Sequence, residues 1–325
     1  MTILSDAIRN KVEFLKFKGL IDSHKAPNCY IIECSDSYLA DNFIKNMAMA
    51  ILCHNNLCGS CRICKAIEED NYIDFIRYPK NNRLQISLKD DINDFQNIYA
   101  MKSYEGGNRV FSFNASETYR DDWQNKLLKV LEEIDINNYI IIYTKNSLGL
   151  LPTIRSRCNI ISVAPYSIDE LKNNSNFISE NNAYKIISLA DGDFSDIALY
   201  NSDSLALEAA EFAIEFFNKC NNSKESLKYI SFIEKNKDYR NIIFKSMIRC
   251  MHNVMTISAN NNIEEIYRKN DILNISENYS IIACSKIIEI INEAKKMADG
   301  NINGTFVITD MVLKILEVKY KCRQL

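Results

Sequence analysis

The chain has 325 residues, of which 47% are apolar and 25% are charged, as in ordinary globular proteins and unlike disordered chains. Its formal net charge of −3 excludes a global positive field that would draw the whole chain to nucleic acid. The length predicts two or three domains, and the scarcity of glycine (8) and proline (4) favours helix.

The first half of the chain alternates strand and helix patterns. Five short apolar runs are typical of buried parallel strands: 29–33, 75–78, 110–113, 140–144 and 159–163. A helical pattern between the third and fourth runs places four side chains on one face: Trp123, Leu127, Leu128 and Leu131. This alternation predicts an α/β fold in which right-handed crossovers join the strands of a parallel sheet.

Strand patterns stop after Pro165. The pattern is helical over 166–201, with a break at Gly192, and it is helical again from 202 to the end. One apolar stripe of this last part consists of Ile281, Cys284, Ile288 and Ile291. We therefore predict three domains: an α/β domain over 1–165, a small helical domain over 166–201 and a helical domain over 202–325.

The sequence carries no recognisable targeting signal. The N-terminus, MTILSDAIRNKVEFLK, lacks the apolar core of a signal peptide, and no run approaches the roughly 18 apolar residues that a membrane span needs. We expect a cytoplasmic protein without membrane contact, in which thiols stay reduced. Seven of the 11 cysteines are scattered, and we interpret them as small buried hydrophobes: Cys29, Cys34, Cys158, Cys220, Cys250, Cys284 and Cys322.

The other four cysteines form a cluster in CHNNLCGSCRIC, and this insert covers 53–64. They are Cys53, Cys58, Cys61 and Cys64. Four thiolates with such short gaps complete a tetrahedral zinc shell, and in a reducing compartment the spacing favours a metal over disulfides. Four ligands leave no open position for a water, so we predict a structural zinc site. His54 remains an alternative ligand in place of Cys53.

The segment NCYIIECSDSYLADNFIKNMAMAILC, residues 28–53, has the pattern of a strand, a short loop and a helix, where a nucleotide-binding fold has its phosphate loop. The pattern G-x-x-G-x-G-K-T, laid on it without a gap, gives the following positions. The glycines fall on Cys34, Ser37 and Leu39, the Lys on Ala40 and the Thr on Asp41. The segment is either an unrelated strand and helix or a phosphate loop that has lost its function, because side chains and a carboxylate would hinder phosphate binding.

A second ATPase signature is also incomplete. The run RVFSFNASETY provides an apolar strand, but the acidic pair that would hold magnesium and orient water falls on Asn114 and Ala115. Both halves of a hydrolysis apparatus are therefore missing from a strand order that would otherwise hold them. The sequence predicts no ATP bound by this chain.

Two further motifs make a resemblance specific, NKLLKVLEE at 125–133 and LLPTIRSRC at 150–158. Together with the four-cysteine insert, they resemble the delta-prime and gamma/tau subunits of the bacterial DNA polymerase III clamp loader, within the AAA+ family. NINGTFVITDMVLKIL, late in the chain, resembles that family's last helical segment. Gamma/tau subunits keep a working phosphate loop and delta-prime subunits often do not, so the losses at Ala40, Asp41, Asn114 and Ala115 favour delta-prime.

The resemblance implies an architecture and a role. It implies a RecA-like five-stranded parallel sheet with a zinc module, a small helical lid domain and a C-terminal helical collar domain. The chain would be an accessory, non-hydrolysing stator of a hetero-pentamer with gamma/tau and delta subunits. That assembly would place the ring-shaped sliding clamp on primed DNA, with limited DNA contact by this chain.

The resemblance also implies a role for the motif Ser156-Arg157-Cys158. Arg157 would act as an arginine finger that completes the ATP site of a neighbouring gamma/tau subunit, because a planar guanidinium can hold two oxygens of the transferring phosphoryl group. Arg155 is the fallback candidate. Thr144 falls where the family senses γ-phosphate, and we interpret it as structural because this chain would have no nucleotide to sense.

Two alternatives belong to other functional classes. The chain could be an active AAA+ ATPase with an aberrant phosphate loop, and measurable ATP affinity of the isolated chain would then be expected. It could also be a zinc-dependent nucleic-acid-binding protein, against which the near absence of basic residues beside the cysteines weighs. Only Arg62 and Lys65 lie near them.

Overall fold

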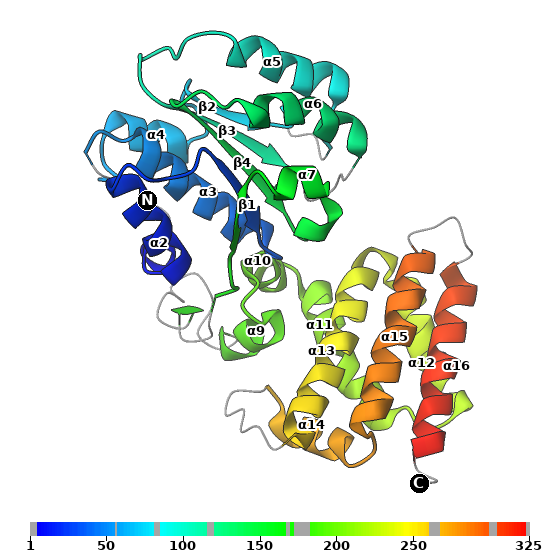
Figure 1. Ribbon diagram of the computed structural model, residues 1–325. Helices are drawn as coiled ribbons and strands as arrows, with labels where there is room; N and C mark the ends of the chain where they lie inside the picture. The colour runs from blue at the N-terminus through cyan, green and yellow to red at the C-terminus, as the bar shows by residue number, and fades with distance from the viewer. Residues whose placement is uncertain are drawn as a thin grey trace. The chain divides into compact units, whose positions relative to one another are not determined.

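The computed structural model contains one sheet of five parallel strands in the order β2-β3-β4-β1-β5 (Figure 1). Its strands are β1 (Cys29–Glu33), β2 (Phe75–Tyr78), β3 (Arg109–Asn114), β4 (Asn138–Thr144) and β5 (Asn159–Ser162). All five predicted strands are confirmed, with differences of one or two residues at the ends of the last three. Every pairing is parallel, as the apolar runs and the interleaved helices predicted.

The structure describes residues 5–55, 57–80, 85–115, 120–166, 170–171, 183–259, 267–298 and 304–322. The chain divides into two compact units. The first comprises Met1–Asn174 with Asp193–Ser195, and the second comprises Ser175–Gly192 with Asp196–Leu325. The predicted division into three domains stays a prediction, and parts of the small helical domain, 167–169 and 172–182, lie outside the described residues.

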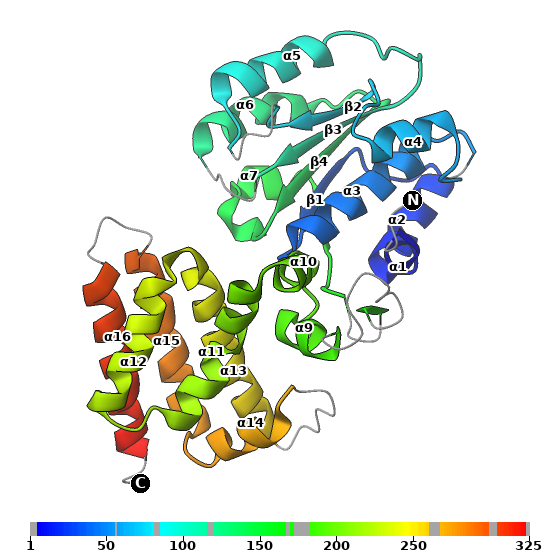
Figure 2. The same cartoon turned by 180° about the vertical axis from the view of Figure 1, so that it is seen from behind.

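Helices cover both faces of the sheet in the first unit (Figures 1 and 2). They are α1 (Ser5–Arg9), α2 (Val12–Asp22), α3 (Ser37–Leu52), α4 (Arg62–Glu68), α5 (Asn93–Tyr99), α6 (Asp121–Glu132) and α7 (Pro152–Arg155). Two short turns of other helix types complete the set, η1 (Leu88–Ile92) and η2 (Ser147–Gly149). Helices α5, α6 and α7 lie over one face, and α3, α4 and the N-terminal helices over the other.

Helix α6 shows how the sequence pattern becomes packing. Trp123, Leu127 and Leu131 of its predicted face are buried in the core, where the ring of Trp123 stacks on Phe113 of β3, whereas Leu128 is only partly buried. Gln124 completes the buried face, and its side chain accepts a hydrogen bond from the N–H of Leu151 at 2.8 Å. This contact connects α6 to the start of α7 and so helps to position the segment that follows.

The second unit is helical. Its helices are α9 (Ala183–Ala190), α10 (Phe194–Ser202), α11 (Ser204–Lys219), α12 (Ser223–Lys235), η4 (Lys237–Tyr239), α13 (Arg240–Ser258), α14 (Lys269–Ser276), α15 (Ile281–Ala298) and α16 (Gly304–Cys322). The first two residues of α10 belong to the first unit. Gly192, with φ of 80°, lies at the predicted break between α9 and α10. Helices α11, α13, α15 and α16 pack side by side in that order around one apolar core.

The stripe predicted on α15 is partly wrong. The helix buries Cys284, Ile287, Ile291 and Ala294, whose spacing is as helical as that of the predicted set. Ile281 is 43% exposed and Ile288 is only partly buried. No helix among the described residues is long and apolar enough to cross a membrane.

Candidate functional site

A carboxylate occupies the N-terminus of α3, where a phosphate loop would present its N–H groups. Asp36 is 1% exposed, and its side chain accepts hydrogen bonds from the N–H groups of Tyr38 (2.8 Å) and Leu39 (3.2 Å). An aspartate in this capping position satisfies donors that a helix otherwise leaves free, and it carries the charge that the helix dipole favours. The anion position at the start of α3 is therefore filled by the chain itself.

The same carboxylate binds a second helix start. It accepts hydrogen bonds from the N–H of Phe194 at 2.6 Å and from the hydroxyl of Ser195 at 3.0 Å, at the beginning of α10. The ring of Phe194 stacks on that of Tyr38, with ring centres 4.5 Å apart. Burial raises the pKa of Asp36, as does the nearby carboxylate of Asp193, while the hydrogen bonds from Phe194, Leu39 and Ser195 oppose that rise.

The loop between β1 and α3 is too short for the glycine-rich turn of a phosphate loop. Only residues 34–36 separate β1 from α3. The thiol of Cys34 is buried and donates to the carbonyl oxygen of Asp36 at 3.3 Å, and burial raises the pKa of this thiol to about 11. Leu39 and Ala40 are fully buried and Ser37 is exposed. Among the predicted phosphate-loop positions, Cys34 thus forms a hydrogen bond within the loop, and Leu39 and Ala40 are part of the core.

Asp41, at the position of the magnesium-binding Thr, belongs to a network of ion pairs. Its carboxylate pairs with Arg77 of β2 and lies 3.6 Å from the ammonium of Lys45. Arg77 and Lys45 also pair with Asp70, Lys45 at 2.8 Å. These two cations are therefore already paired with carboxylates beside the start of α3.

The end of β3 and the end of β4 carry no acidic pair. Asn114 is exposed and Ala115 is fully buried, with its N–H donating to the carbonyl of Tyr143 at 2.8 Å. Thr144 is fully buried, and its hydroxyl donates to the carbonyl of Asn146 and accepts from the N–H of the same residue. These hydrogen bonds close the turn after β4, which supports the structural role predicted for Thr144.

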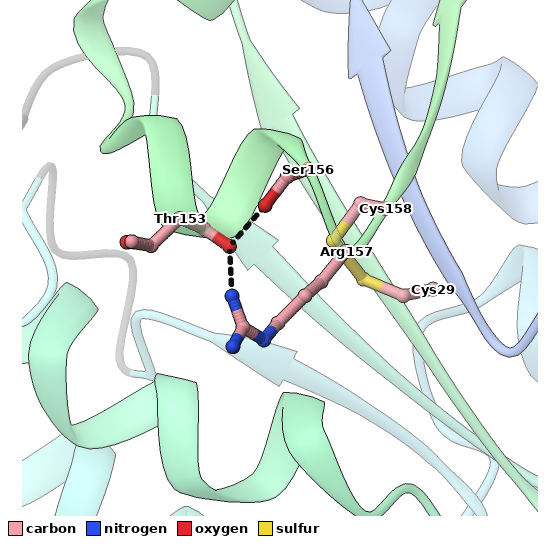
Figure 3. Close-up of a disulfide and its surroundings, with 5 residues drawn as sticks. All are labelled: Cys29, Thr153, Ser156, Arg157 and Cys158. Atoms are coloured by element: carbon pink, nitrogen blue, oxygen red, sulfur yellow. Dashed lines mark hydrogen bonds between the residues drawn. A yellow bond between two sulfur atoms is a disulfide. The ribbon is translucent and has the colours of Figure 1, made fainter.

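Arg157 lies in the turn between α7 and β5, and its side chain is 35% exposed. One guanidinium nitrogen donates to the carbonyl of Thr153 at 3.0 Å, and another donates to the carboxylate of Glu132 at 2.9 Å. Ser156 is exposed, and its hydroxyl donates to the same carbonyl of Thr153 (Figure 3). An exposed ion pair contributes only about 0.2–1 kcal/mol to stability. The guanidinium of Arg157 is therefore at the surface and only weakly held by Glu132.

Arg155 differs from Arg157 although it lies two residues away. It is the last residue of α7 and is only partly exposed. Its Nε atom is buried and has no hydrogen-bond partner among the described residues. A guanidinium with a buried nitrogen is less available to an outside ligand than that of Arg157.

The prediction that the seven scattered cysteines are reduced and buried is wrong for two of them. Cys29 and Cys158 form a disulfide, with Cα atoms 4.7 Å apart (Figure 3). The register of the sheet explains this, because Tyr30 faces Asn159 and the two cysteines are the residues that precede this pair. Of the others, the predicted buried thiols are confirmed for Cys34, Cys220, Cys250 and Cys284, and nothing is described of the side chain of Cys322.

The four clustered cysteines lie together, from the residue that follows α3 to the first turn of α4, which contains Cys64. Their sulfur atoms all lie within 4.8 Å of one another, and Sγ of Cys53 is 3.7 Å from Sγ of Cys58 and of Cys61. A tetrahedral zinc with Zn–S bonds of about 2.3 Å separates its sulfurs by about 3.8 Å, so the donor set fits this ion. Gly59, with φ of 70°, makes the turn between the ligand pairs.

The cluster consists of thiols without histidine. Cys53 and Cys64 are buried and Cys58 is exposed, while His54 is exposed and lies outside the cluster of described side chains. The N–H groups of Ser60 and Cys61 lower the pKa of Cys58 to about 6. Thiolate is the form that binds metal, so these donors favour ligation by Cys58, whereas burial raises the pKa of Cys64.

The role of Asp36 was not anticipated from the sequence. An aspartate directly before a predicted helix is a capping signal, and that signal could have identified its contact with α3. Its contact with Phe194 and Ser195 spans 158 and 159 positions of the chain. No local pattern indicates such a distant partner.

Comparison with known proteins first defines the class. The family described as DNA polymerase III, delta subunit, matches residues 10–167, which contain the whole sheet and the cysteine cluster. The DNA polymerase III subunit delta' of Haemophilus influenzae is 26% identical over 133 residues, which are 40% of this chain and 40% of that protein. The delta' subunit of Bacillus subtilis is 22% identical over 273 residues, which are 80% of this chain and 81% of that protein.

The matched region is therefore similar to subunits of DNA polymerase III. More particularly, the chain is a relative of the delta-prime subunits, and the resemblance that its motifs predicted is confirmed. The chain spans less than half of the length of the Haemophilus relative. A gamma subunit-related protein of DNA polymerase III from Thermotoga maritima, of known structure, aligns with 94% of this chain and 99% of its own, with a TM-score of 0.49 and 14% identity.

Proposed function

We propose that this chain is a delta-prime-type stator of a DNA polymerase III clamp loader, with an AAA+ fold in its first unit. It helps to load the sliding clamp on primed DNA without hydrolysing ATP itself. The observation that carries the proposal is the carboxylate of Asp36, which takes the donors of the α3 N-terminus. The family match and the names of the relatives supply the assembly in which such a chain acts.

Electrostatics supports the absence of nucleotide. A triphosphate at the start of α3 would meet two buried or ion-paired carboxylates, Asp36 and Asp41, instead of a lysine and free N–H groups. Its charge would be repelled where a working loop attracts it. The absence of an acidic pair at Asn114 and Ala115 removes the groups that hold magnesium. We therefore assign no ATP to this chain.

Arg157 is the residue that we assign to the ATP site of a neighbouring gamma/tau subunit. Its guanidinium is partly exposed, and its ion pair with Glu132 is weak enough to exchange for a phosphate. Negative charge builds on the γ-phosphoryl oxygens during transfer, and a planar guanidinium stabilises two of them at once. Arg155 is the weaker candidate because part of its guanidinium is buried.

The assembly that we propose is a hetero-pentamer with gamma/tau and delta subunits in the cytoplasm. The helices after residue 202 pack with those of the other subunits as a collar, and the first unit abuts a gamma/tau neighbour. Contact with primed DNA is limited and directed at the backbone, since the net charge of the chain is −3. The sliding clamp is engaged by the assembly as a whole.

Zinc is the ion that we assign to the cysteine cluster. Cys53, Cys58, Cys61 and Cys64 would hold it, and four thiolates leave no position for a substrate. Its part is structural, because it would fix the turn between α3 and α4. Metal analysis of the purified chain should find one zinc per chain, lost in Cys61→Ser and retained in Cys284→Ala, a variant of a buried thiol in the helical unit.

Reconstitution tests the proposed function. The chain is mixed with gamma/tau and delta subunits, clamp and primed DNA, and clamp loading is followed with and without it. We expect a stable complex whose loading requires the chain, while the isolated chain binds no ATP at millimolar concentration. A chain that forms no complex, or that binds ATP tightly alone, would refute the proposal, and the second result would favour an active ATPase.

A further inference from the structure

The disulfide between Cys29 and Cys158 lies at the beginning of an edge strand. Cys29 is the first residue of β1, Cys158 directly precedes β5, and the disulfide joins the two (Figure 3). Among the residues that the structure describes, β5 is at the edge of the sheet and pairs with β1 alone. The bond therefore adds a covalent link to the ladder at the end where β5 begins. The strand β5 has four residues, which pair with β1, and the link adds a covalent restraint to this pairing at its start.

The same bond fixes one side of the turn that carries Arg157. On the other side, the N–H of Ser156 donates to the carbonyl of Pro152 and the N–H of Arg157 donates to that of Ile154, both at 3.0 Å. Arg157 thus lies between the hydrogen-bonded end of α7 and a residue that is bonded to the sheet. Breaking the disulfide leaves only the hydrogen bonds and the start of β5 to position it.

The two sulfurs differ in access. Cys29 is 2% exposed, whereas Cys158 is partly exposed although it packs against the apolar core. A thiolate from solution therefore reaches the sulfur of Cys158 first, and Cys29 is the leaving group. Disulfides that occur in a reducing compartment are usually transient and redox-sensing rather than permanent.

We propose that Cys29 and Cys158 form a reversible redox pair that exchanges with low-molecular-weight thiols and disulfides. Oxidation clamps the turn carrying Arg157 to β1, and reduction releases it. The existence of the pair stands on the geometry of the two strands. Its effect on ATP turnover rests on the proposed function of Arg157.

The exchange is balanced with glutathione as reductant. A glutathione thiolate attacks Sγ of Cys158, the protein S–S bond breaks, and its electron pair leaves on Sγ of Cys29, which takes up a proton. A second glutathione thiolate then attacks the glutathione sulfur of the mixed disulfide and releases Cys158 as thiolate. Two glutathione thiols become one glutathione disulfide while one protein disulfide becomes two thiols. Oxidation is the reverse, with glutathione disulfide as oxidant.

The first test uses the full chain with zinc bound, so that the clustered cysteines are protected. The chain is equilibrated in glutathione buffers of varied thiol-to-disulfide ratio, alkylated, and analysed by peptide mass spectrometry. We expect a reversible transition between free thiols and a cross-linked pair of peptides containing Cys29 and Cys158. Cys284→Ala should keep the transition and Cys158→Ala should lose it. No cross-linked pair at any ratio would overturn the proposal.

The second test is amide hydrogen exchange over 157–162 in both redox states. We expect several-fold slower exchange in the oxidised chain, with no redox response in Cys158→Ala. Equal exchange in both states would overturn the clamping role. In the reconstituted loader, turnover should be higher with oxidised chain. If Arg157→Ala leaves turnover unchanged, the proposed finger fails, while the mass and exchange measurements still decide the redox pair.

Discussion

The two ends of β1 differ in charge and in exposure. The carboxyl end leads to Asp36, a buried anion that takes hydrogen bonds from the starts of two helices. The amino end is bonded through Cys29 to the turn of Arg157, a partly exposed cation with one ion pair. One strand thus connects the place from which we propose that phosphate is excluded to the place from which we propose that a guanidinium reaches a neighbour's phosphate.

The largest expected effect concerns the amino end. Under oxidising conditions, Cys158→Ala should lower the free energy of unfolding by up to about 5 kcal/mol, because the bond closes a loop with a sequence separation of 129. Denaturant titration of both chains measures this difference. Under reducing conditions the wild type also lacks the bond, so the difference in free energy of unfolding should nearly vanish. The alanine itself should cost little, because Cys158 is partly exposed. A gap that persists after reduction would show that the alanine, not the bond, causes the loss.

Arg157→Lys should reduce turnover of the reconstituted loader almost as much as alanine does. Lysine keeps the charge but cannot hold two phosphoryl oxygens in one plane. A loss of tenfold corresponds to about 1.4 kcal/mol of transition-state stabilisation. Full activity of the lysine variant would indicate that only the charge at this turn matters.

At the carboxyl end, Asp36→Ala should lower the free energy of unfolding by about 0.5–2 kcal/mol, the range measured for lost helix caps. Thermal unfolding of the isolated chain measures it. The variant should still bind no ATP, because Lys and glycine remain absent at Ala40, Ser37 and Leu39. ATP binding after this single change would show that Asp36 alone closes the site.

The smallest effect is a pH dependence at Glu33, the last residue of β1. The N–H of Ser147 lowers the pKa of this carboxyl, and the hydroxyls of Ser147 and Ser162 lower it further. A carboxyl whose pKa is lower in the folded than in the unfolded chain stabilises the fold at pH values above its unfolded-state pKa. This stabilisation is lost as the pH falls through the folded-state pKa. Glu33→Gln should cost on the order of 0.5 kcal/mol at neutral pH and nothing in strong acid, because exposed interactions are screened.

The sheet could be predicted from the sequence because buried parallel strands are short apolar runs separated by helix patterns. The cysteine cluster could also be predicted, because its four cysteines lie within one short insert. Contacts between distant segments could not. The pairing of Cys29 with Cys158 depends on β1 and β5 being neighbours, and the second set of donors to Asp36 depends on where α10 begins. The prediction of the buried stripe on α15 was partly wrong because several sets of apolar residues on this helix have the same helical spacing.

The most direct test of the central claim separates binding from turnover in the assembled loader. ATP affinity and ATP turnover are measured with clamp and primed DNA, for wild type, Arg157→Ala and Arg268→Ala, whose arginine is equally exposed at 35% and also ion-paired. The account predicts unchanged affinity and a several-fold or larger fall in turnover for Arg157→Ala alone, with the complex intact by gel filtration. Unchanged turnover in an intact complex would contradict it, and Arg157 would then be a structural residue of the turn.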